Sequence, residues 1–432
     1  MSQKSPPTTH APPRWMFVDL NSYFASVEQQ ERPELRGRPV IVVPLMSDHT
    51  CAIAASYQAK KYGVKTGANV GEAKRMCPGL VLVEANHENY VKYHEKIKTE
   101  IERHYPIQVV GSIDEVGLLL DDKRANEKEA IALAKRIKQG LRENVGEVIT
   151  CSIGIAPNRY LAKVASDLTK PDGLEVIRLE DMPGRLQDLK LTDLPGIGRN
   201  MEPRLHESGI KTFLDLWYAE PQVLHKVWGG VGGDRFWQRL HGGELDDDLT
   251  DLPVQNRSIG HSHVLSPEFR GHREAAVVAQ RLLLKAASRL RRMGYRATEM
   301  TLSLRAENQG RGKAHQRFLP VSDSFALTKT LEVLWVSALH QIGESRVKKI
   351  GVTLQGLEDV LSPQQLDLFP ELGSAITADV GRRDKLSKIM DDLNQEFGRD
   401  SIALGFAPDL VKTFSGTKIA FTRIPDLQEF KE

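Results

Sequence analysis

The chain has 432 residues, of which 40% are hydrophobic and 27% are charged, and its formal net charge is +2. This composition is typical of a globular protein, the length is sufficient for about three domains, and the small net charge does not by itself indicate a nucleic-acid partner. No apolar run approaches the roughly 20 residues of a membrane-spanning helix, and the three cysteines are too widely spaced to indicate a zinc site or a disulfide framework, so we expect a cytoplasmic protein with no membrane partner.

The first acid of interest follows a short apolar segment near the N-terminus. Residues 1–14 are rich in Pro, Ser and Thr and are predicted to be a disordered tail. Residues 15–18 predict a buried strand that stops at Asp19, where the chain turns helical. The helix begins with two adjacent aromatic residues, Tyr23 and Phe24, so that one can face the core while the other faces a cleft.

A short helix with a phenolic and a basic side chain follows the strands predicted at 40–43 and 52–55. Tyr57 and Lys60 are one turn apart and therefore share a face of this helix. On an isolated helix such a pair is most often a solvated patch. Opposite a site of carboxylates and metal ions, the same pair is a candidate clamp for a triphosphate.

Two adjacent acids, Asp114 and Glu115, lie between the apolar runs 107–110 and 118–120. Because a strand alternates its faces, both acids cannot point inward at mid-strand, and their place near its start indicates the mouth or edge of a sheet. If strand ends meet in one sheet, Asp19 joins the pair. Carboxylates about 4 Å apart repel by roughly 4 kcal/mol per pair at an effective dielectric of about 20, so such a cluster would need cations. Oxygen-only ligands favour magnesium or manganese over zinc, although each acid taken singly is most often a turn or cap residue.

The segment after the acidic pair predicts a helix over 127–143, a buried strand over 150–156 and a second helix from about residue 158. A proline and a glycine end the second helix just after Lys170. Lys170 at that end either caps carbonyl groups or contacts a phosphate.

Five segments together resemble, in order and spacing, the Y-family DNA polymerases, and most of all the bacterial DNA polymerase IV type. The resemblance runs from about residue 14 to residue 361, and the segments are specific in combination although each alone is weak. They are Phe17-Val18-Asp19, Tyr23-Phe24-Ala25-Ser26-Val27-Glu28, Tyr57-Gln58-Ala59-Lys60-Lys61-Tyr62-Gly63-Val64, Ser112-Ile113-Asp114-Glu115, and Leu161-Ala162-Lys163-Val164-Ala165-Ser166-Asp167 with Lys170-Pro171.

The resemblance implies an α+β multidomain fold. It is the right-hand arrangement of a polymerase, with a palm, fingers and a helix-hairpin-helix thumb, followed by a β/α little-finger domain. The implied boundaries are 15–21 and 87–177 for the palm, 22–86 for the fingers, 178–250 for the thumb, 256–361 for the little finger, and 362–432 for a linker and C-terminal tail.

The resemblance also implies a metal site and a nucleotide site. Two magnesium ions, for which manganese can substitute, would serve in-line transfer of a nucleotide from dNTP to the primer 3′-hydroxyl. The catalytic and metal-binding residues would be Asp19, Asp114 and Glu115, with the Leu20 carbonyl as a further ligand. Phe24 matches the family's steric gate against the ribose 2′-hydroxyl, with Tyr23 packed beside it. The positions that match contacts to the incoming triphosphate are Tyr57, Lys60 and Lys170.

Three departures from the family's pattern stand close to these sites. The family usually has arginine where this chain has Lys60, so a point charge replaces a bidentate fork and we expect a weaker grip on the triphosphate. It usually has alanine and an aromatic residue where this chain has Val116 and Gly117, and an acid where this chain has Asn21.

Two later segments indicate contacts with DNA. The first, from Leu194 to Arg199, looks like the hairpin of a helix-hairpin-helix motif, in which Gly196 and Gly198 let backbone N–H groups approach a phosphate. Arg199 adds positive charge. From Gln255 the pattern predicts strand, helix, strand, strand, helix and strand in a segment rich in Arg and Lys, which fits the little finger as a second DNA-binding module. The two middle strands are expected at 298–305 and 317–321, on either side of a Gly/Arg/Lys loop.

The linker after residue 361 contains a peptide that resembles the bacterial sliding-clamp binding motif. Its glutamine would make polar contacts while its leucine and phenylalanine side chains fill a hydrophobic pocket; the alternative is a loop that docks on its own protein. The peptide is Gln365-Leu366-Asp367-Leu368-Phe369. Further on, 385–398 and 417–424 resemble the tail of the polymerase V catalytic subunit.

Two functions from different classes follow from these motifs. The first is a monomeric, template-directed, low-fidelity DNA polymerase for translesion synthesis, which uses primer-template DNA and dNTPs and reaches stalled forks through the sliding clamp. The alternative is a catalytically inactive relative that bridges clamp and DNA. The retained Asp19, Asp114 and Glu115 favour the enzyme, whereas Gly117 and Lys60 leave the alternative open.

Overall fold

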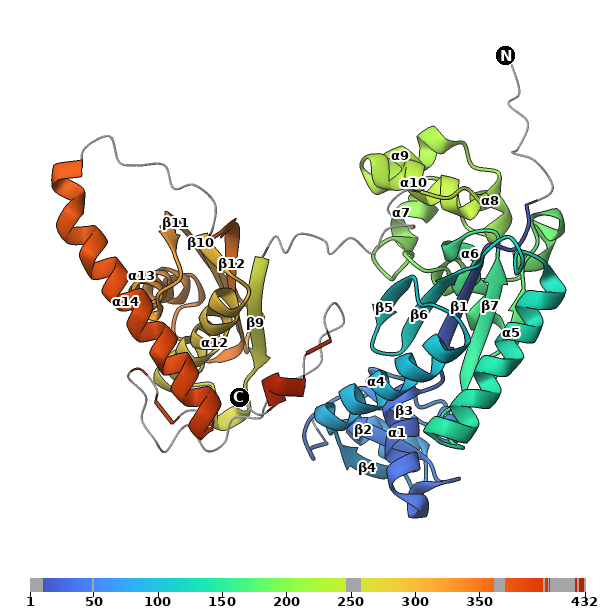
Figure 1. The fold of residues 1–432 in the computed structure, drawn as a ribbon, viewed down its shortest axis with the longest axis horizontal. Coiled ribbons are helices and arrows are strands. Elements are labelled where there is room, and N and C mark those ends of the chain that lie inside the picture. The colour runs from blue at the N-terminus through green and yellow to red at the C-terminus, as the bar shows by residue number, and fades with distance from the viewer. Residues whose placement is uncertain are drawn as a thin grey trace. The chain divides into compact units, whose positions relative to one another are not determined.

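A computed structural model of the chain describes residues 11–48, 50–245, 258–360, 370–398, 401–402, 404, 424–425 and 427–430. The main described segments form two compact units, one ending at residue 245 and the other beginning at residue 258 (Figure 1). The predicted clamp-binding peptide from Gln365 to Phe369 lies outside the described residues, as do residues 1–10 of the predicted tail and residues 417–423. None of the described helices is both long enough and apolar enough to span a membrane.

The first unit is built on a five-stranded sheet with the order β5-β6-β1-β7-β8. Its strands are β1 (Trp15–Leu20), β5 (Val109–Ser112), β6 (Glu115–Leu119), β7 (Cys151–Ala156) and β8 (Leu174–Val176). The central strand β1 pairs antiparallel with both β6 and β7. All six of its residues are buried, which is why the strand reads as an almost continuous apolar run in the sequence.

Helix α6 (Arg159–Leu168) packs closely on β1 and β7. A glycine makes this approach possible, because a Cβ at Gly154 would lie 2.0 Å from the Ala162 carbonyl oxygen. Phe17 is paired with Gly154 and belongs to the same apolar cluster as the buried residues of α6. Since strand side chains alternate, Asp19 lies on the side of the sheet that carries α6.

Two further helices complete the scaffold around this sheet (Figure 1). Helix α4 (His87–His104) contacts α5 (Glu127–Gly140), and α5 contacts β7 and β8. The helix predicted over 127–143 is α-helical only to Gly140 and continues as a π-turn from Leu141 to Val145. Gly140 lies against α4, where a Cβ would be 2.3 Å from Glu100 Oε1.

A three-stranded sheet with the order β3-β2-β4 follows β1 in the chain. Its elements and neighbouring helices are α1 (Tyr23–Glu31), β2 (Val40–Val43), β3 (Ala54–Ala55), α2 (Tyr57–Lys60), α3 (Val70–Met76) and β4 (Val81–Glu84). Only two residues of the strand predicted at 52–55 are in strand conformation.

Short helices make up the last part of the first unit. They are α7 (Glu202–Glu207), α8 (Phe213–Trp217), α9 (Pro221–Trp228) and α10 (Val231–Leu240). Their buried side chains share one apolar cluster with α6 and with Trp15 and Phe17 of β1. This helical region contacts α6 through α10, and α6 in turn packs on β1 and β7 of the five-stranded sheet.

The second unit confirms the predicted order of strand, helix, strand, strand, helix and strand. The elements are β9 (Ser258–Val264), α12 (His272–Arg292), β10 (Tyr295–Ala306), β11 (Arg311–Val321), α13 (Ser324–Ile342) and β12 (Val347–Asp359). They form an antiparallel sheet with the order β11-β10-β12-β9, and both helices pack on it.

The Gly/Arg/Lys loop predicted between the two middle strands is shorter than expected, because β10 extends to Ala306 and β11 already begins at Arg311. Charged residues alternate there with small ones: Arg311 and Lys313 are exposed while Gly312 is buried. A Cβ at Gly312 would lie 2.2 Å from the Ala338 carbonyl oxygen of α13, so only glycine fits beneath the helix. This alternation is the period of a strand with one covered face and one open face.

A helix not predicted from the sequence packs on this unit. Helix α14 (Pro370–Phe397) contacts α12 and α13. Ser387 Oγ accepts a hydrogen bond of 3.0 Å from the Ser324 backbone N–H, and Arg291 Nε lies 2.7 Å from Asp391 Oδ2. The second half of α14 is thus joined to both of the other helices.

Candidate active site

The three predicted carboxylates meet at one end of the five-stranded sheet. Asp19 in β1 lies directly opposite Glu115, the first residue of β6. Asp114 occupies the turn between β5 and β6, and its carbonyl oxygen accepts a hydrogen bond of 2.8 Å from the Leu20 N–H. The pairing register, which the sequence does not specify, therefore places an acid from near the N-terminus beside the adjacent pair.

Burial and mutual repulsion make this group of acids costly to ionise. Burial raises the pKa of the Asp114 carboxyl, and the charge of Asp19 adds to the rise, while a hydrogen bond from Ser112 opposes it. Ser112 Oγ lies 2.5 Å from Asp114 Oδ1. Burial also raises the pKa of Glu115, with Asp19 and Asp114 as further causes. Because each acid acts on the others, the cluster favours a bound positive charge.

Two lysines supply positive charge to this cluster. Lys163 Nζ lies 2.6 Å from Asp19 Oδ2 and 2.5 Å from Glu115 Oε1, and Lys170 Nζ lies 2.7 Å from Asp19 Oδ1. Burial lowers the pKa of the Lys163 ammonium, but Asp19 and Glu115 outweigh this effect and the net shift is upward. Asp19, which is only 5% exposed, thus has an ammonium group at each oxygen.

Lys163 is absent from the predicted site, although it lies within one of the five quoted segments. Lys163 could have been recognised from the sequence as a lysine among apolar residues in a predicted helix. Leu161, Ala162, Val164 and Ala165 around it are all buried, so its charge had to have a partner inside the fold.

The donor set of this cluster fits a hard divalent cation, because carboxylate and carbonyl oxygens are the ligands that magnesium and manganese prefer. Within the described ranges, no group of three or more His, Cys, Asp or Glu side chains is arranged as a ready metal site. The Lys163 ammonium stands between Asp19 and Glu115, where a cation would bind both. The residues therefore fit such an ion provided that Lys163 moves aside.

The predicted gate, Phe24, has a rigid support. Its ring stacks on Tyr90 of α4 at a centroid distance of 4.3 Å and an interplanar angle of 16°. Tyr90 is fixed in turn, since its hydroxyl donates to Glu28 Oε1 at 2.6 Å and its carbonyl accepts from the Tyr23 hydroxyl at 2.6 Å. Tyr23 is buried and Phe24 is half-buried, so the two adjacent aromatic residues differ in exposure as expected.

The predicted triphosphate contacts also lie close to one another. Lys60 Nζ is 4.3 Å from the centre of the Tyr57 ring and donates to Ser22 Oγ at 2.8 Å. Burial lowers the pKa of Lys60, and the charge of Lys170 lowers it further. Burial raises the pKa of Tyr57, against the charge of Lys170 and a hydrogen bond from Ser22. These three residues thus act on one another electrostatically, and Ser22 links two of them.

Asn21 is the anchor of the loop that follows Lys170. Its Oδ1 accepts a hydrogen bond of 2.7 Å from the Asp172 N–H, and its Nδ2 donates to Ser152 Oγ at 3.0 Å. An aspartate could accept the first bond but could not donate the second. Asn21 therefore joins the loop after Lys170 to Ser152 of β7, and only its bond to Ser152 requires an amide donor.

The departure at Gly117 is also compensated. A Cβ at this position would lie 3.2 Å from Trp15 Cζ3 and 3.9 Å from Phe17 Cδ2. Trp15 is fully buried on the neighbouring strand, so its indole fills the space that an aromatic side chain on β6 would need. The space over Gly117 is thus filled by the Trp15 indole of β1.

The residues predicted to contact DNA phosphate are separate from the carboxylates. Gly196, Gly198 and Arg199 are exposed in the loop before α7. Gly196 has φ +92, a backbone conformation that other residues rarely adopt, and it lies over Phe236. The loop therefore presents backbone groups and one guanidinium to solvent.

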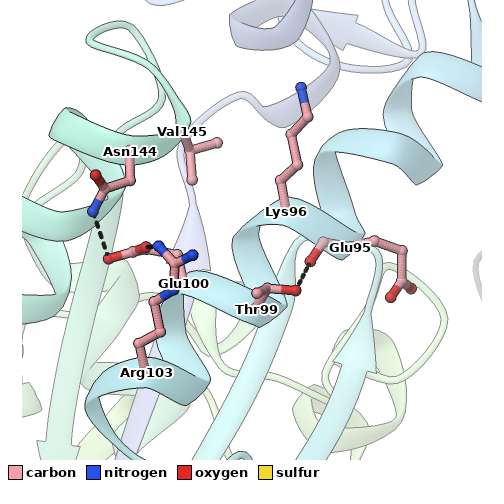
Figure 2. A pocket seen from close by; sticks show the side chains of 7 residues that line it. All are labelled: Glu95, Lys96, Thr99, Glu100, Arg103, Asn144 and Val145. Carbon is pink, nitrogen blue, oxygen red and sulfur yellow. Dashed lines mark hydrogen bonds and ion pairs between the residues drawn. The ribbon is translucent and has the colours of Figure 1, made fainter.

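A hollow of about 300 Å³ lies on α4 away from these groups (Figure 2). Its inner wall is the buried Glu100, which accepts hydrogen bonds from Asn144 at 3.0 Å and Arg103 at 2.8 Å. The lining residues are Glu95, Lys96, Thr99, Glu100, Arg103, Asn144 and Val145. None of them belongs to the predicted site.

Comparisons with known proteins show what this chain is similar to. Residues 18–167 match the impB/mucB/samB family, residues 256–368 match the C-terminal domain of that family, and residues 192–243 match the thumb domain described for DNA polymerase-iota. DNA polymerase IV of Moorella thermoacetica is 34% identical over 394 residues, which are 89% of this chain and 93% of the relative. DNA polymerase IV 1 of Bacillus subtilis is 28% identical over 391 residues, which are 90% of this chain and 91% of the relative.

Solved structures give the same result. A Y-family DNA polymerase chimera of Dbh and Dpo4 is similar with a TM-score of 0.67 and 26% identity, covering 79% of this chain and 98% of the chimera. An insertion ternary complex of Dbh DNA polymerase has a TM-score of 0.52 and 27% identity with the same coverage. These similarities confirm the α+β multidomain fold that the sequence indicated.

Proposed function

The chain belongs to the Y-family of DNA polymerases and is of the DNA polymerase IV type, and we propose that Asp19, Asp114 and Glu115 are its catalytic residues. The protein is accordingly a DNA-directed DNA polymerase for translesion synthesis that binds DNA and dNTP and depends on divalent metal ions. The residue assignment rests on one observation. Strands β1 and β6 pair Asp19 with Glu115 at the end of the sheet at which Asp114 occupies the turn between β5 and β6. The relatives named DNA polymerase IV support an active enzyme rather than an inactive adaptor.

The carboxylates and the Leu20 carbonyl would hold two magnesium ions, which manganese could replace. Bound there, the ions would lower the pKa of the primer 3′-hydroxyl and neutralise the triphosphate during in-line displacement. Lys60, Tyr57 and Lys170 would bind and orient the triphosphate, because their side chains already act on one another. The Lys163 ammonium neutralises Asp19 and Glu115 before any cation binds.

Sugar selection would come from Phe24. Its ring is held flat against Tyr90, whose hydroxyl is itself bound to Glu28, so the Phe24 ring cannot leave its place without losing the stack. A ribose 2′-hydroxyl would have to enter the space of the ring. A rigid obstacle discriminates better than a mobile one, because the wrong substrate cannot push it aside at low cost.

We propose the domain assignment as palm for 15–21 and 87–177, fingers for 22–86, thumb for 178–250 and little finger for 256–361. In the thumb, Gly196, Gly198 and Arg199 would contact a DNA phosphate, since they are exposed in the loop before a helix. In the little finger, the open face of the sheet would bind a second stretch of backbone. Arg311, Lys313 and Arg317 occupy alternate positions of β11 and are all exposed.

We also propose a monomeric, cytoplasmic enzyme that binds the sliding clamp through Gln365 to Phe369. The three cysteines carry free thiols, in keeping with a reducing compartment. Leu368→Ala with Phe369→Ala should abolish co-elution with the clamp while extension without clamp is unchanged. Co-elution that persists would remove this peptide from the proposal.

The catalytic assignment is tested by primer extension with magnesium and each single dNTP. Native protein should add the template-matched nucleotide, and Asp114→Ala with Glu115→Ala should add none while binding the duplex normally in fluorescence anisotropy. The matched control is Asp121→Ala with Asp122→Ala, an exposed adjacent acid pair in the same unit. Extension that survives in the first variant would show that these two residues are not catalytic.

A further inference from the structure

One face of α4 contacts both the predicted sugar gate at Phe24 and the turn that carries Asp114. Tyr90 and His94 are one helical turn apart and both are buried. Tyr90 carries the stacked ring of Phe24, while His94 reaches the catalytic turn, where its Nδ1 lies 2.7 Å from the Ile113 carbonyl oxygen. His94 therefore touches the residue immediately before Asp114.

Only His94 can be the donor in this hydrogen bond. A carbonyl oxygen only accepts hydrogen bonds, so Nδ1 of His94 must carry the hydrogen. His94 is 3% exposed, and burial lowers the pKa of its imidazole, which favours the neutral ring. The nearest charged groups that act on it, Lys98 and Glu95, are on its own helix and oppose each other. The contact is thus a bond from a neutral Nδ1–H tautomer to the backbone.

The turn that His94 contacts is short. Within it, Ser112 Oγ donates to Asp114 Oδ1 at 2.5 Å and accepts from the Asp114 N–H at 3.4 Å. Ile113 and Asp114 alone connect β5 and β6. The carbonyl of Asp114 is held from β1 by the Leu20 N–H at 2.8 Å, and the carbonyl of Ile113 is held from α4 by His94 at 2.7 Å. Two consecutive peptide groups are therefore held by two different elements, β1 and α4, which restricts the backbone torsions that aim the Asp114 side chain.

We propose that His94 is a positioning residue that aims the Asp114 carboxylate by holding the Ile113 carbonyl. This inference rests on the proposed role of Asp114 and adds a residue that none of the quoted family segments contains. Helix α4 then sets the gate through Tyr90 and the catalytic turn through His94, each independently of the other.

The test separates the hydrogen bond from the bulk of the ring. In His94→Asn the side-chain amide nitrogen can take the place of Nδ1, whereas His94→Gln presents its amide farther out and His94→Leu has no donor. A matched control is His104→Leu, because His104 lies on the same helix and bonds Glu100 away from the turn. Thermal melting reports whether each variant is folded.

Three quantities are measured for each folded variant: the Mn²⁺ dissociation constant by electron paramagnetic resonance, the rate of single-nucleotide incorporation, and the selectivity for dNTP over rNTP. His94→Leu should weaken Mn²⁺ binding and slow incorporation by about five- to tenfold, the effect of one lost hydrogen bond. His94→Asn should recover most of both, while His104→Leu changes neither. Sugar selectivity should stay within about twofold of native in all variants, because the stack of Phe24 on Tyr90 is retained.

Several outcomes would overturn the proposal. His94→Leu with native Mn²⁺ affinity and rate would show that the bond does not aim Asp114. His94→Asn as impaired as His94→Leu would show that only the volume of the ring matters. If His94→Leu does not fold, the comparison of His94→Asn with His94→Gln decides, and equal behaviour of the two contradicts the proposal. Failure of the catalytic assignment itself is recognised separately, by extension that survives loss of Asp114 and Glu115.

Discussion

The indole of Trp15 occupies the space above Gly117, with 3.2 Å between Trp15 Cζ3 and the position of a Cβ on residue 117. The two residues lie on adjacent strands of the sheet that carries the carboxylates. The large side chain and the small one are thus a matched pair. Each is tolerated because of the other.

Exchanging the large and small residues tests this relation. Gly117→Phe should destabilise the protein by about 1–3 kcal/mol through overpacking, and Trp15→Ala by about 3–5 kcal/mol through a cavity. The double variant should lose less than the sum of the two. Urea unfolding measures the coupling, with Gly184→Phe as control because nothing lies within 4 Å of a Cβ there. Strictly additive losses would contradict the matched pair.

Removing the Lys163 ammonium should change the response to metal. In Lys163→Met, Asp19 and Glu115 lose the cation between them, and without divalent metal the melting temperature should fall by roughly 2–4 °C. Added Mg²⁺ should raise it more than in native protein, because the ion no longer competes with an ammonium. Lys135→Met, an exposed position on α5, is the control. An equal Mg²⁺ shift in both proteins would show that Lys163 does not stand in for the metal.

Loss of the Ser22 hydroxyl should weaken nucleotide binding. Ser22 accepts a hydrogen bond from Lys60, and it has φ +48, so an alanine there is strained while a glycine is not. Ser22→Gly should raise the apparent dNTP dissociation constant by about three- to tenfold with little change in the maximal rate. Single-turnover kinetics measure both constants. Ser22→Ala should weaken binding equally if the hydroxyl is responsible; a loss confined to the alanine variant would assign the effect to the backbone.

Glu100 should make stability depend on pH. The side chain is 3% exposed, and although burial raises its pKa, hydrogen bonds from Asn144, His104 and Arg103 produce a net lowering. An acid with a lowered folded pKa stabilises the protein above its unfolded pKa of about 4.3, and this stability is lost as the pH falls through the folded value.

The measurement compares Glu100→Gln with native protein in urea unfolding at pH 7 and at about pH 3.5. The variant should be less stable by about 1 kcal/mol at pH 7, since Arg103 is largely in solvent and contributes little. The difference should shrink at the lower pH. Glu102→Gln, an exposed acid on the same helix, should show no such trend. A constant difference at both pH values would mean that ionisation of Glu100 is not the cause.

The sequence was sufficient for the features that depend on neighbours in the chain. Asp19 and the pair Asp114 and Glu115 stand out because each interrupts or ends an apolar run. The strand and helix order of the second unit follows from periodicity and was confirmed. The start of β11 was placed too late, because alternating basic and glycine residues are typical of a loop and only the covering helix α13 explains them.

Contacts between distant segments could not be read from the chain. Lys163 lies 144 residues from Asp19, and His94 lies 19 residues from Ile113, yet each pair is in hydrogen-bond contact. From the sequence alone, several roles are possible for a lysine in an apolar helix, a histidine on a helix or a glycine in a strand. Which explanation applies depends on strand register and on the face that each helix turns to the sheet.

The sequence by itself determined which carboxylates, aromatic residues and lysines the polymerase carries, because these residue types and their spacing are local properties. The tertiary structure alone decided that Lys163 bridges two acids, that the Trp15 indole fills the space over Gly117, and that His94 contacts the turn that carries Asp114. These relations arise only when pairing in the sheet and packing of α4 and α6 bring segments together, since packing energy depends on shape in three dimensions and not on position along the chain.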